Sequence, residues 1–471
     1  MFRFLMSGLS AGLLLSGVAV ANDIAPDKAS FSSLQKFEAG RIPESMKGIW
    51  QSQGYGWLFD ISDEGVRQYQ IAGEYCFASP SAEQAMTDTL ALSYQYYRTS
   101  SSPDAAILQL LPDDTEIQIR RVATLPTICQ SDLNWSREAV LDYVAELIET
   151  HYAFKDLRSI DWPARVQAAS TQFSENMDDE QFFDLVAGLI DGFSDSHTKL
   201  IGTVNGERRK QQDGLGETLS TVRAKNMETP WLISLFSTLQ EDILDPGSEH
   251  TANDRILWGM IEDRIGYIQI LQMGGFSGVG IGDPEFRVAE FAVFDEIMDR
   301  ALVQMQDAEF VILDLSNNRG GYDAISRRLA GRFTQQRFVG YTTHVPGSGV
   351  PARERMIEPT SGLSYTGPVI LLTSDVTVSG GEIATLALRE LPNVTHVGTT
   401  TRGSFSTVLS KPLPNGWVLE LSNEVIATPD GTVYEELGIL PEIEMSVFPQ
   451  DALIEGHKSV IDAIVANAPN F

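Results

Sequence analysis

The segment around Ser379 combines a potential nucleophile with backbone groups that could stabilise negative charge. An apolar run over 369–372 leads through a short polar turn to Ser379 and Gly380, at the predicted start of a helix over 382–391. The free N–H groups and the positive end of a helix favour an oxyanion that develops beside such a serine. The same residues fit an ordinary helix cap, in which Ser379 and Glu382 form a capping box. The segment alone leaves both interpretations open.

Two further segments supply a potential base and a second glycine-containing turn. Ser196 and His197 follow the predicted end of a helix in polar surroundings, which suits a base carried on a loop. The apolar run 310–315 leads into a polar loop that ends with Gly320 and Gly321, and glycines let backbone N–H groups approach a ligand closely. A lone histidine is more often structural than catalytic, and a strand followed by glycines is often an ordinary turn. Neither segment identifies a function by itself.

The order of these segments resembles that of the C-terminal processing (tail-specific) peptidases and of the core of the tricorn protease. The pattern consists of Ser-His at 196–197, Asn-x-Gly-Gly at 318–321, Ser-Gly-Gly-Glu-Ile at 379–383, Gly-Thr-Thr-Thr-Arg-Gly at 398–403 and Tyr-Glu-Glu-Leu-Gly-Ile at 434–439. The resemblance covers most of the chain after the first 134 residues. It implies a serine peptidase with an α/β catalytic core of the ClpP/crotonase-like type.

One departure from the family pattern selects a branch. Tail-specific peptidases pair their serine with a lysine in a Gly-Lys turn, whereas the corresponding turn here is Gly403-Ser404. The catalytic lysine is therefore missing, and the chain is similar to the tricorn-like branch, which uses a Ser–His pair instead.

The resemblance to this branch implies a role for each matching residue. Ser379 would be the nucleophile and His197 the general base, while Glu435 together with Ser196 would orient and polarise the imidazole. A serine needs such a base to take its proton, and a carboxylate behind the histidine fixes its tautomer and stabilises the imidazolium. Glu436 is an alternative to Glu435 for the supporting carboxylate.

The remaining role is that of the oxyanion hole. The resemblance implies that Gly380, with Gly320 or Gly321, supplies N–H groups to the carbonyl oxygen as it becomes negative. The substrate would be a peptide or an unfolded protein, cleaved through an acyl-enzyme without any cofactor.

An alternative function is suggested by interphotoreceptor retinoid-binding protein, which is similar in core pattern but carries a ligand. A non-catalytic binder has no need to keep Ser379, His197 and Glu435 together.

Charge and composition restrict the partners. The chain has 471 residues, and 34 Lys and Arg against 64 Asp and Glu give a net charge of −30. A surface this acidic repels nucleic acids and anionic lipid headgroups. The six histidines are scattered, and the sequence has neither a Walker A nor a His-Glu-x-x-His motif, so no metal or cofactor is expected. The oligomeric state is left open.

The first 21 residues are typical of a signal peptide. Arg3 precedes an apolar run over 5–18, and Ala-Val-Ala at 19–21 forms a small-x-small cleavage site before Asn22. The alternative, a short membrane anchor, needs a longer apolar run than this one, and no later segment has the ~20 apolar residues of a spanning helix. We therefore expect an exported protein, periplasmic or secreted, without stable membrane insertion.

The remaining sequence is divided by changes in its periodicity. Residues 22–131 show the period of two that is typical of strands, which predicts a β-rich, barrel-like domain. Its two cysteines, Cys76 and Cys129, could form a disulfide after export or remain buried thiols. Residues 132–202 switch to helical periodicity, with Ser136 as a predicted helix cap, and end in the Ser-His loop.

The C-terminal part contains the predicted catalytic core. Residues 203–255 are polar and irregular, which suggests a loop-rich insertion that could act as a lid. Over 256–449, apolar runs alternate with helical patterns at 285–306 and 323–333, which predicts an α/β core with a largely parallel sheet. A C-terminal helix is expected within 450–471.

Overall fold

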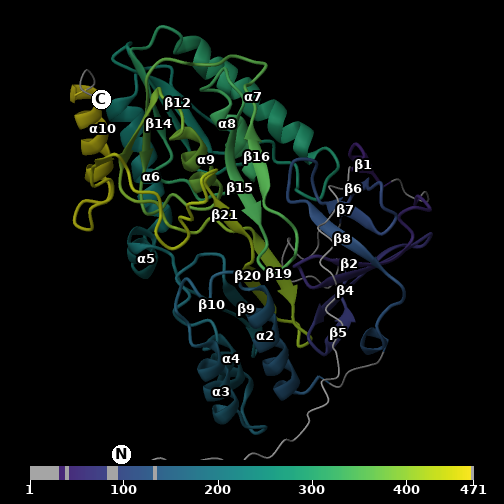
Figure 1. The fold of residues 1–471 in the computed structure, drawn as a ribbon. Coiled ribbons are helices and arrows are strands. Elements are labelled where there is room, and N and C mark those ends of the chain that lie inside the picture. The colour runs from purple at the N-terminus through teal and green to yellow at the C-terminus, as the bar shows by residue number, and fades with distance from the viewer. Residues whose placement is uncertain (1–30, 38–41, 82–93, 131–134, 468–471) are drawn as a thin grey trace, which may run out of the picture.

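The structure is a computed structural model that describes residues 31–37, 42–81, 94–130 and 135–467. The predicted signal peptide over 1–21 lies outside these residues. Figure 1 shows an N-terminal antiparallel sheet beside a larger core of helices and strands, with a helical segment and a small sheet below the core. No helix in the described part of the chain is both long enough and apolar enough to cross a lipid bilayer.

The N-terminal sheet has eight antiparallel strands, which confirms the β-rich character of this region. Their spatial order is β1 (Gln35–Lys36), β6 (Tyr96–Thr99), β7 (Ala105–Gln109), β8 (Ile117–Val122), β2 (Gly48–Ser52), β3 (Trp57–Ser62), β4 (Gly65–Ala72) and β5 (Tyr75–Ala78). Alternate side chains along the strands, such as Trp50, Phe59 and Ile119, are buried on the inner face of the sheet. Within the described residues no pairing joins β1 to β5, so the barrel-like closure is not confirmed.

A disulfide joins Cys76 on β5 to Cys129 in a short 3₁₀ turn over Thr127–Cys129. The two cysteines are 53 residues apart in sequence, and both belong to the N-terminal region. The expected bridge is therefore present, and it constrains this region alone.

The helical segment follows, and its first helix is as predicted. It comprises α2 (Arg137–His151), α3 (Trp162–Gln172) and α4 (Asp179–Ala187). The Ser136 hydroxyl accepts a hydrogen bond from the Ala139 N–H at 3.2 Å and caps α2. The side chains on the inner face of α2, from Val140 to His151, are buried. The sequence analysis did not predict α3.

The prediction of a loop-rich insertion over 203–255 is wrong. This region contains the end of β9 (Lys199–Val204), then β10 (Glu207–Gln212), α5 (Glu217–Ala224), α6 (Glu228–Thr238), a π-helical turn (Leu239–Ile243) and β11 (Glu249–Thr251). Trp231, Leu235 and Leu239 recur at helical spacing and are buried. Leu232, Ile233 and Phe236 lie between them, so the apolar residues of α6 do not form a single helical stripe that the sequence could reveal.

The core is built on a seven-stranded sheet. Its order is β11, β12 (Ile256–Ile261), β13 (Ile265–Ile270), β14 (Phe310–Asp314), β17 (Val369–Thr373), β18 (Val394–Gly398) and β22 (Ile443–Glu444). The pairs from β13 to β22 are parallel, and only β11, β12 and β13 pair antiparallel. The largely parallel sheet is thus confirmed.

Helices cover both faces of this sheet. Val311 and Leu313 on β14 pack in the cluster with α7 (Phe286–Gln304), α8 (Asp323–Ala330) and α9 (Gly380–Leu388). Ile312, between them, packs in the opposite cluster with α5, α6 and α10 (Glu455–Asn467). Strands buried on both faces need continuous apolar runs, which is why these segments could be recognised in the sequence.

Two smaller sheets connect this core to the rest of the molecule. One has the order β10, β9, β20 (Val418–Ser422), β19 (Val408–Pro412), and the other has the order β16 (Arg353–Ile357), β15 (Phe338–His344), β21 (Val425–Ala427). Pairing of β9 with β20 attaches the strand that follows His197 to the C-terminal part of the chain.

A buried lysine attaches the N-terminal sheet to the core. Lys411 on β19 is fully buried, and its Nζ donates to the carbonyls of Tyr55 and Gly56 and to Gln70 Oε1 at 3.1 Å. Burial holds the pKa of the Lys411 ammonium well below its usual value. Two of these acceptors lie in the β2–β3 connection and the third on β4, so separating the N-terminal sheet from β19 would leave the Lys411 ammonium without hydrogen-bond acceptors.

Removing the disulfide tests how the N-terminal sheet is stabilised. We expect Cys76→Ala/Cys129→Ala to lose roughly 2–4 kcal/mol of unfolding free energy in this sheet, because the unfolded loop is no longer closed. Proteolysis in increasing urea, with cut sites located by mass spectrometry, measures the loss. Reduction of the wild-type protein should give the same shift, and an unchanged urea midpoint in both cases would contradict the prediction.

Candidate functional site

Ser379 lies at the N-terminus of α9 with a strained backbone. Its φ is 55° and its ψ is −117°, a conformation that non-glycine residues rarely adopt. The Ser379 N–H is held by two acceptors, Ser404 O at 3.1 Å and Glu382 Oε2 at 3.2 Å. A Cβ atom at Gly320 would lie 2.7 Å from Ser379 Cβ, so this close approach requires glycine at position 320. Strain of this kind is typical of functional sites.

The Glu382 carboxylate connects α9 to the 401–404 loop. Besides Ser379, it accepts hydrogen bonds from the Thr401 hydroxyl at 2.7 Å and from the N–H groups of Gly403 at 2.6 Å and Ser404 at 2.9 Å. Burial raises the pKa of Glu382 to about 7, and its four donors oppose that shift. Glu382 therefore does more than cap a helix, because it also fixes the loop on which Ser379 depends.

The glycines predicted to form an oxyanion hole differ in their free hydrogen-bonding groups. The Gly320 N–H donates to Asn318 Oδ1 at 2.9 Å, and its carbonyl accepts from the Met273 N–H at 2.7 Å. In the described part of the chain, the N–H groups of Gly321 and Gly380 have no hydrogen-bond partner. A Cβ on Gly380 would lie 3.0 Å from Gly321 N. Of the two alternatives, the geometry thus favours Gly321 as the companion of Gly380.

His197 lies in the turn before β9, and the buried Asp195 shapes this turn. Asp195 Oδ1 accepts the N–H groups of His197 at 3.1 Å and Thr198, and also the Ser422 hydroxyl at 2.8 Å. The same carboxylate accepts the Tyr152 hydroxyl at 2.8 Å through Oδ2. The sequence analysis did not identify Asp195, although it lies two residues before His197. An aspartate at this spacing is typical of an Asx turn.

The His197 imidazole is itself buried and poorly partnered. Burial lowers the pKa of His197 to about 4, with Lys199 acting in the same direction and Asp195 against it. Its Nδ1 has no hydrogen-bond partner among the described residues, and no hydrogen bond joins the ring to Ser379. His197 and Ser379 nevertheless line the same cleft, which has a volume of roughly 390 Å³ and is open to solvent.

Ser196 was predicted to help orient the imidazole, but its hydrogen bonds go to other groups. Its hydroxyl donates to the Gly214 carbonyl at 2.6 Å, and its N–H donates to Ser404 Oγ at 2.9 Å. Ser404 thus accepts hydrogen bonds from both Ser379 and Ser196. Ser196 lines the cleft, but its hydrogen bonds position the His197 loop and do not reach the ring.

The two neighbouring glutamates occupy different environments. Glu435 is buried, and its Oε2 accepts the N–H groups of Phe405 at 2.9 Å and Ser406 at 3.3 Å. Glu435 Oε1 has no hydrogen-bond partner in the described chain, and burial, with Asp195 nearby, holds the pKa of this carboxyl well above its usual value. Glu436 is more exposed and accepts the Ser194 hydroxyl at 3.0 Å. The burial of Glu435 therefore favours it over Glu436 as the carboxylate that supports His197.

One arginine joins this acidic group. The Arg158 guanidinium lies 3.6 Å from Asp195 Oδ2, 3.9 Å from Glu435 Oε1 and 3.2 Å from Glu436 Oε2. Arg158 follows α2, far from these residues in sequence, and nothing in the local pattern could have identified it. Its positive charge offsets the repulsion between buried carboxylates.

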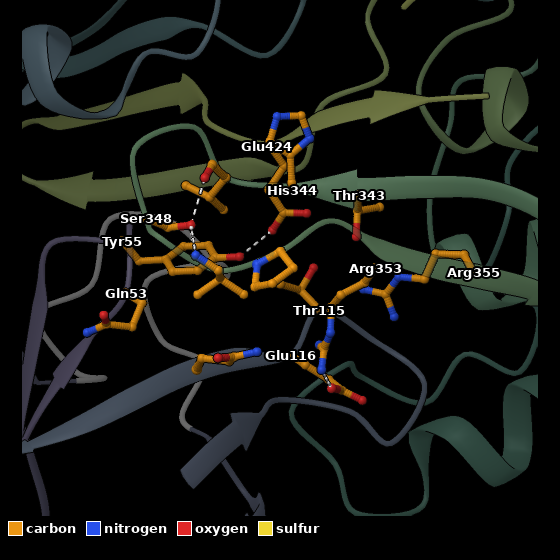
Figure 2. A pocket seen from close by; sticks show the side chains of 14 residues that line it. Gln53, Tyr55, Thr115, Glu116, Thr343, His344, Ser348, Arg353, Arg355 and Glu424 are labelled. Atoms are coloured by element: carbon orange, nitrogen blue, oxygen red, sulfur yellow. Dashed lines mark hydrogen bonds and ion pairs between the residues drawn. The ribbon is translucent and has the colours of Figure 1, made fainter. Parts of the chain in front are cut away.

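A second cavity lies between the N-terminal sheet and the β15–β16 hairpin. Figure 2 shows the Tyr55 hydroxyl donating to Glu424 Oε1, at 2.7 Å, and Arg353 paired with Glu116. The cavity is small, with a volume of roughly 30 Å³, and contains none of the predicted site residues. Within the described ranges, no group of three or more His, Cys, Asp or Glu side chains is arranged to hold a metal ion.

Comparisons with known proteins agree with the predicted core. Residues 264–445 match the model of Peptidase family S41. A putative peptidase from Parabacteroides merdae superposes with a TM-score of 0.56 at 20% identity, over 71% of this chain and 98% of that chain. A mutant of CPAF superposes with a TM-score of 0.51 at 11% identity, over 69% and 96% of the two chains. At these identities the superpositions show a shared fold. No curated protein sequence matches this chain.

Changing Glu382 to glutamine tests its role in positioning Ser379. Both oxygens of the Glu382 carboxylate accept hydrogen bonds. A glutamine would replace one of these acceptors with an NH₂ group, which would face N–H or O–H donors and could not accept from them. We expect Glu382→Gln to lose about 1–3 kcal/mol of unfolding free energy and at least about tenfold in peptide cleavage. Urea unfolding and hydrolysis of a labelled unfolded protein measure the two effects.

Glu424→Gln is the matched control, because Glu424 is a buried carboxylate that accepts hydrogen bonds in the other cavity. It should lose stability without a comparable loss of cleavage by the folded fraction. Wild-type stability and cleavage in Glu382→Gln would disprove the role given to Glu382.

Proposed function

This chain has a catalytic core of peptidase family S41 and is a serine-type peptidase, and we propose that Ser379 is its nucleophile and His197 its general base. The observation that carries this proposal is the strained Ser379 in a cleft that also contains His197. A carrier protein would gain nothing from the strained serine, so the ligand-binding alternative is not favoured.

Each step of peptide hydrolysis has a candidate group in or next to this cleft. Ser379 Oγ would attack the scissile carbonyl while His197 takes its proton and later passes it to the leaving amine. The N–H groups of Gly321 and Gly380 would stabilise the oxyanion. Water, activated by the same histidine, would then hydrolyse the acyl-enzyme. The missing Ser379–His197 hydrogen bond is compatible with these roles, because catalytic hydrogen bonds often tighten only when substrate is bound.

The supporting carboxylate in this proposal is Glu435. Its Oε1 atom lacks a donor, and His197 Nδ1 lacks an acceptor, so a contact between the two would satisfy both buried groups. Such a contact would hold the neutral tautomer that has its lone pair on Nε2, facing the serine. Ser196 would contribute by fixing the loop, through its hydrogen bonds to Gly214 and Ser404.

Export is also part of the proposal. The signal-like segment over 1–21 motivates it, and the Cys76–Cys129 disulfide supports it, because structural disulfides persist in oxidising compartments. Mature protein recovered outside the cytoplasm should therefore begin at Asn22. We further propose that the substrate is an extended peptide or an unfolded protein.

The catalytic assignment predicts the effect of two single substitutions. Ser379→Ala and His197→Ala should each lower the cleavage of a labelled unfolded protein by about 10³-fold or more, because the nucleophile and the base act as a unit. Ser348→Ala and His344→Ala, in the second cavity, are the matched controls and should cleave normally. Circular dichroism should show that all four variants are folded.

Two results would overturn this assignment. One is cleavage that survives in folded Ser379→Ala. The other is a wild-type protein that neither cleaves nor reacts with a serine-directed fluorophosphonate, which would make a binding protein the better interpretation.

The low pKa of His197 predicts an unusual pH profile. The general base must be neutral, and a pKa of about 4 keeps the imidazole neutral where an ordinary histidine is protonated. We expect kcat/KM to stay high down to about pH 5 and to fall at lower pH. An acid limb with its midpoint near pH 6.5 would contradict the assignment.

Unfolding must be separated from titration in this experiment. Because the native pKa of His197 is lowered, the unfolded chain binds the proton first, and stability falls as the pH is lowered from about 6.5 to 4. His151 and His396, whose pKa values burial lowers to about 3, act in the same direction. Activity restored on return to neutral pH, with an unchanged circular dichroism spectrum in acid, identifies the titration.

A further inference from the structure

The cleft that contains Ser379 and His197 has a positive lining in a strongly negative protein. The chain carries a net charge of −30, yet among the residues that the structure describes no aspartate or glutamate lines this cleft. Its cationic lining residues are Lys199, Arg208, Lys210, Arg223, Arg319 and Arg402. A local reversal of sign against the overall charge needs an explanation, because like charges that face one another reduce stability.

Neighbouring carboxylates neutralise only part of this charge. Lys199 pairs with Glu420 at 2.6 Å. Arg223 and Arg319 share the single carboxylate of Glu228, each at 2.7 Å. The Arg319 Nη2 atom is buried without a hydrogen-bond partner among the described residues, and burial lowers the pKa of this guanidinium. Two arginines on one glutamate leave a net positive charge at this wall of the cleft.

The other cations have no carboxylate partner in the part of the chain that the structure describes. Arg208 and Lys210 are two residues apart on β10, so their side chains lie on the same face of the strand. The Lys210 ammonium donates to Gln212 Oε1 at 2.7 Å. Burial lowers the pKa of Lys210, and the positive charges of Arg223, Lys199 and Arg208 lower it further. The cations of this wall therefore repel one another.

Arg402 contributes charge to the cleft from the 401–404 loop. Its guanidinium donates to the carbonyls of Asp375 and Gly214, the latter at 2.7 Å, and not to a carboxylate. These bonds fix the side chain in place without a direct ion pair, and the nearby carboxylates of Asp375 and Glu382 offset only part of the effect of its burial. Arg402 also lies 3.4 Å from the Ser196 hydroxyl, next to the predicted base. The positive groups thus line the same cleft as Ser379 and His197.

We propose that this cleft selects acidic peptides, whose aspartate and glutamate side chains near the scissile bond pair with Arg208, Lys210 and Arg402. This inference rests on the proposed function and adds a substrate class to it. Side-chain carboxylates are favoured over a single terminal carboxylate because the cations come from β9, β10, α5 and the loops at 319 and 402, too widely spread for one carboxylate. Carboxylates would supply the missing negative charge and form charge-assisted hydrogen bonds.

A binding experiment tests this without requiring catalysis. Full-length Ser379→Ala protein is titrated into short fluorescent peptides that contain either glutamates or glutamines at the same positions, both with amidated C-termini. We expect the glutamate peptide to bind at least about tenfold more tightly at low salt, and the difference to shrink at high salt. A third peptide, the glutamine sequence with a free C-terminus, reports on terminal carboxylate binding.

Two double variants in the same Ser379→Ala background locate the effect. Arg208→Gln/Lys210→Gln should reduce the preference for the glutamate peptide by about tenfold. Arg67→Gln/Arg120→Gln removes the same charge from exposed positions on the N-terminal sheet and should leave the preference unchanged. The comparison separates a local site from the overall charge of the protein.

The outcomes distinguish this inference from the proposed function. Equal affinity for the two amidated peptides, or a preference that survives Arg208→Gln/Lys210→Gln, would overturn the inference while leaving serine catalysis intact. A preference seen only with the free C-terminus would also overturn it, as would tighter binding of a single-stranded oligonucleotide of equal charge. Loss of cleavage in Ser379→Ala bears on the catalytic proposal alone.

Discussion

The geometry of the site depends on one buried carboxylate. Glu382 accepts hydrogen bonds from Ser379, Thr401, Gly403 and Ser404, and it thereby holds the head of α9 against the 401–404 loop. A strained backbone at Ser379 costs on the order of 1–3 kcal/mol, and it persists only where the surroundings enforce it. Here the Ser379 backbone is held by its hydrogen bond to Glu382 and by the close packing of Gly320 against its Cβ.

Ser404 extends this constraint to the histidine loop. It is fully buried, its carbonyl accepts the Ser379 N–H, and its hydroxyl accepts the Ser196 N–H, next to His197. The position where tail-specific peptidases are expected to carry lysine is thus used here to join the two loops. A lysine would remove the hydroxyl acceptor and bury a second charge beside Glu382. Serine rather than lysine at this position is consistent with the proposed Ser–His pair, because its hydroxyl joins the two loops that carry the proposed nucleophile and base.

The sequence was sufficient for features that are local. The buried strands at 310–315 and 369–372 and the helices after them are as predicted, since each is a continuous apolar or periodic segment. Helix α6 was missed because the apolar residues between Trp231 and Leu239 obscure the helical spacing. Helix α5 was missed because it is short and mostly polar, and only Thr218, Leu219 and Val222 are buried. Arg158 was missed for another reason: its partners Asp195 and Glu435 lie far from it in sequence, and only the fold brings them together.

Burial and charge act together on His197. Burial and the nearby Lys199 both favour the neutral imidazole, which is the form that can accept a proton from Ser379. The same Lys199 belongs to the cationic lining of the cleft. An acidic peptide in the cleft would offset that positive charge and shift the pKa of His197 upward, which makes it a stronger base when substrate is present. A lining that selects an acidic substrate would therefore also couple substrate binding to the strength of the base.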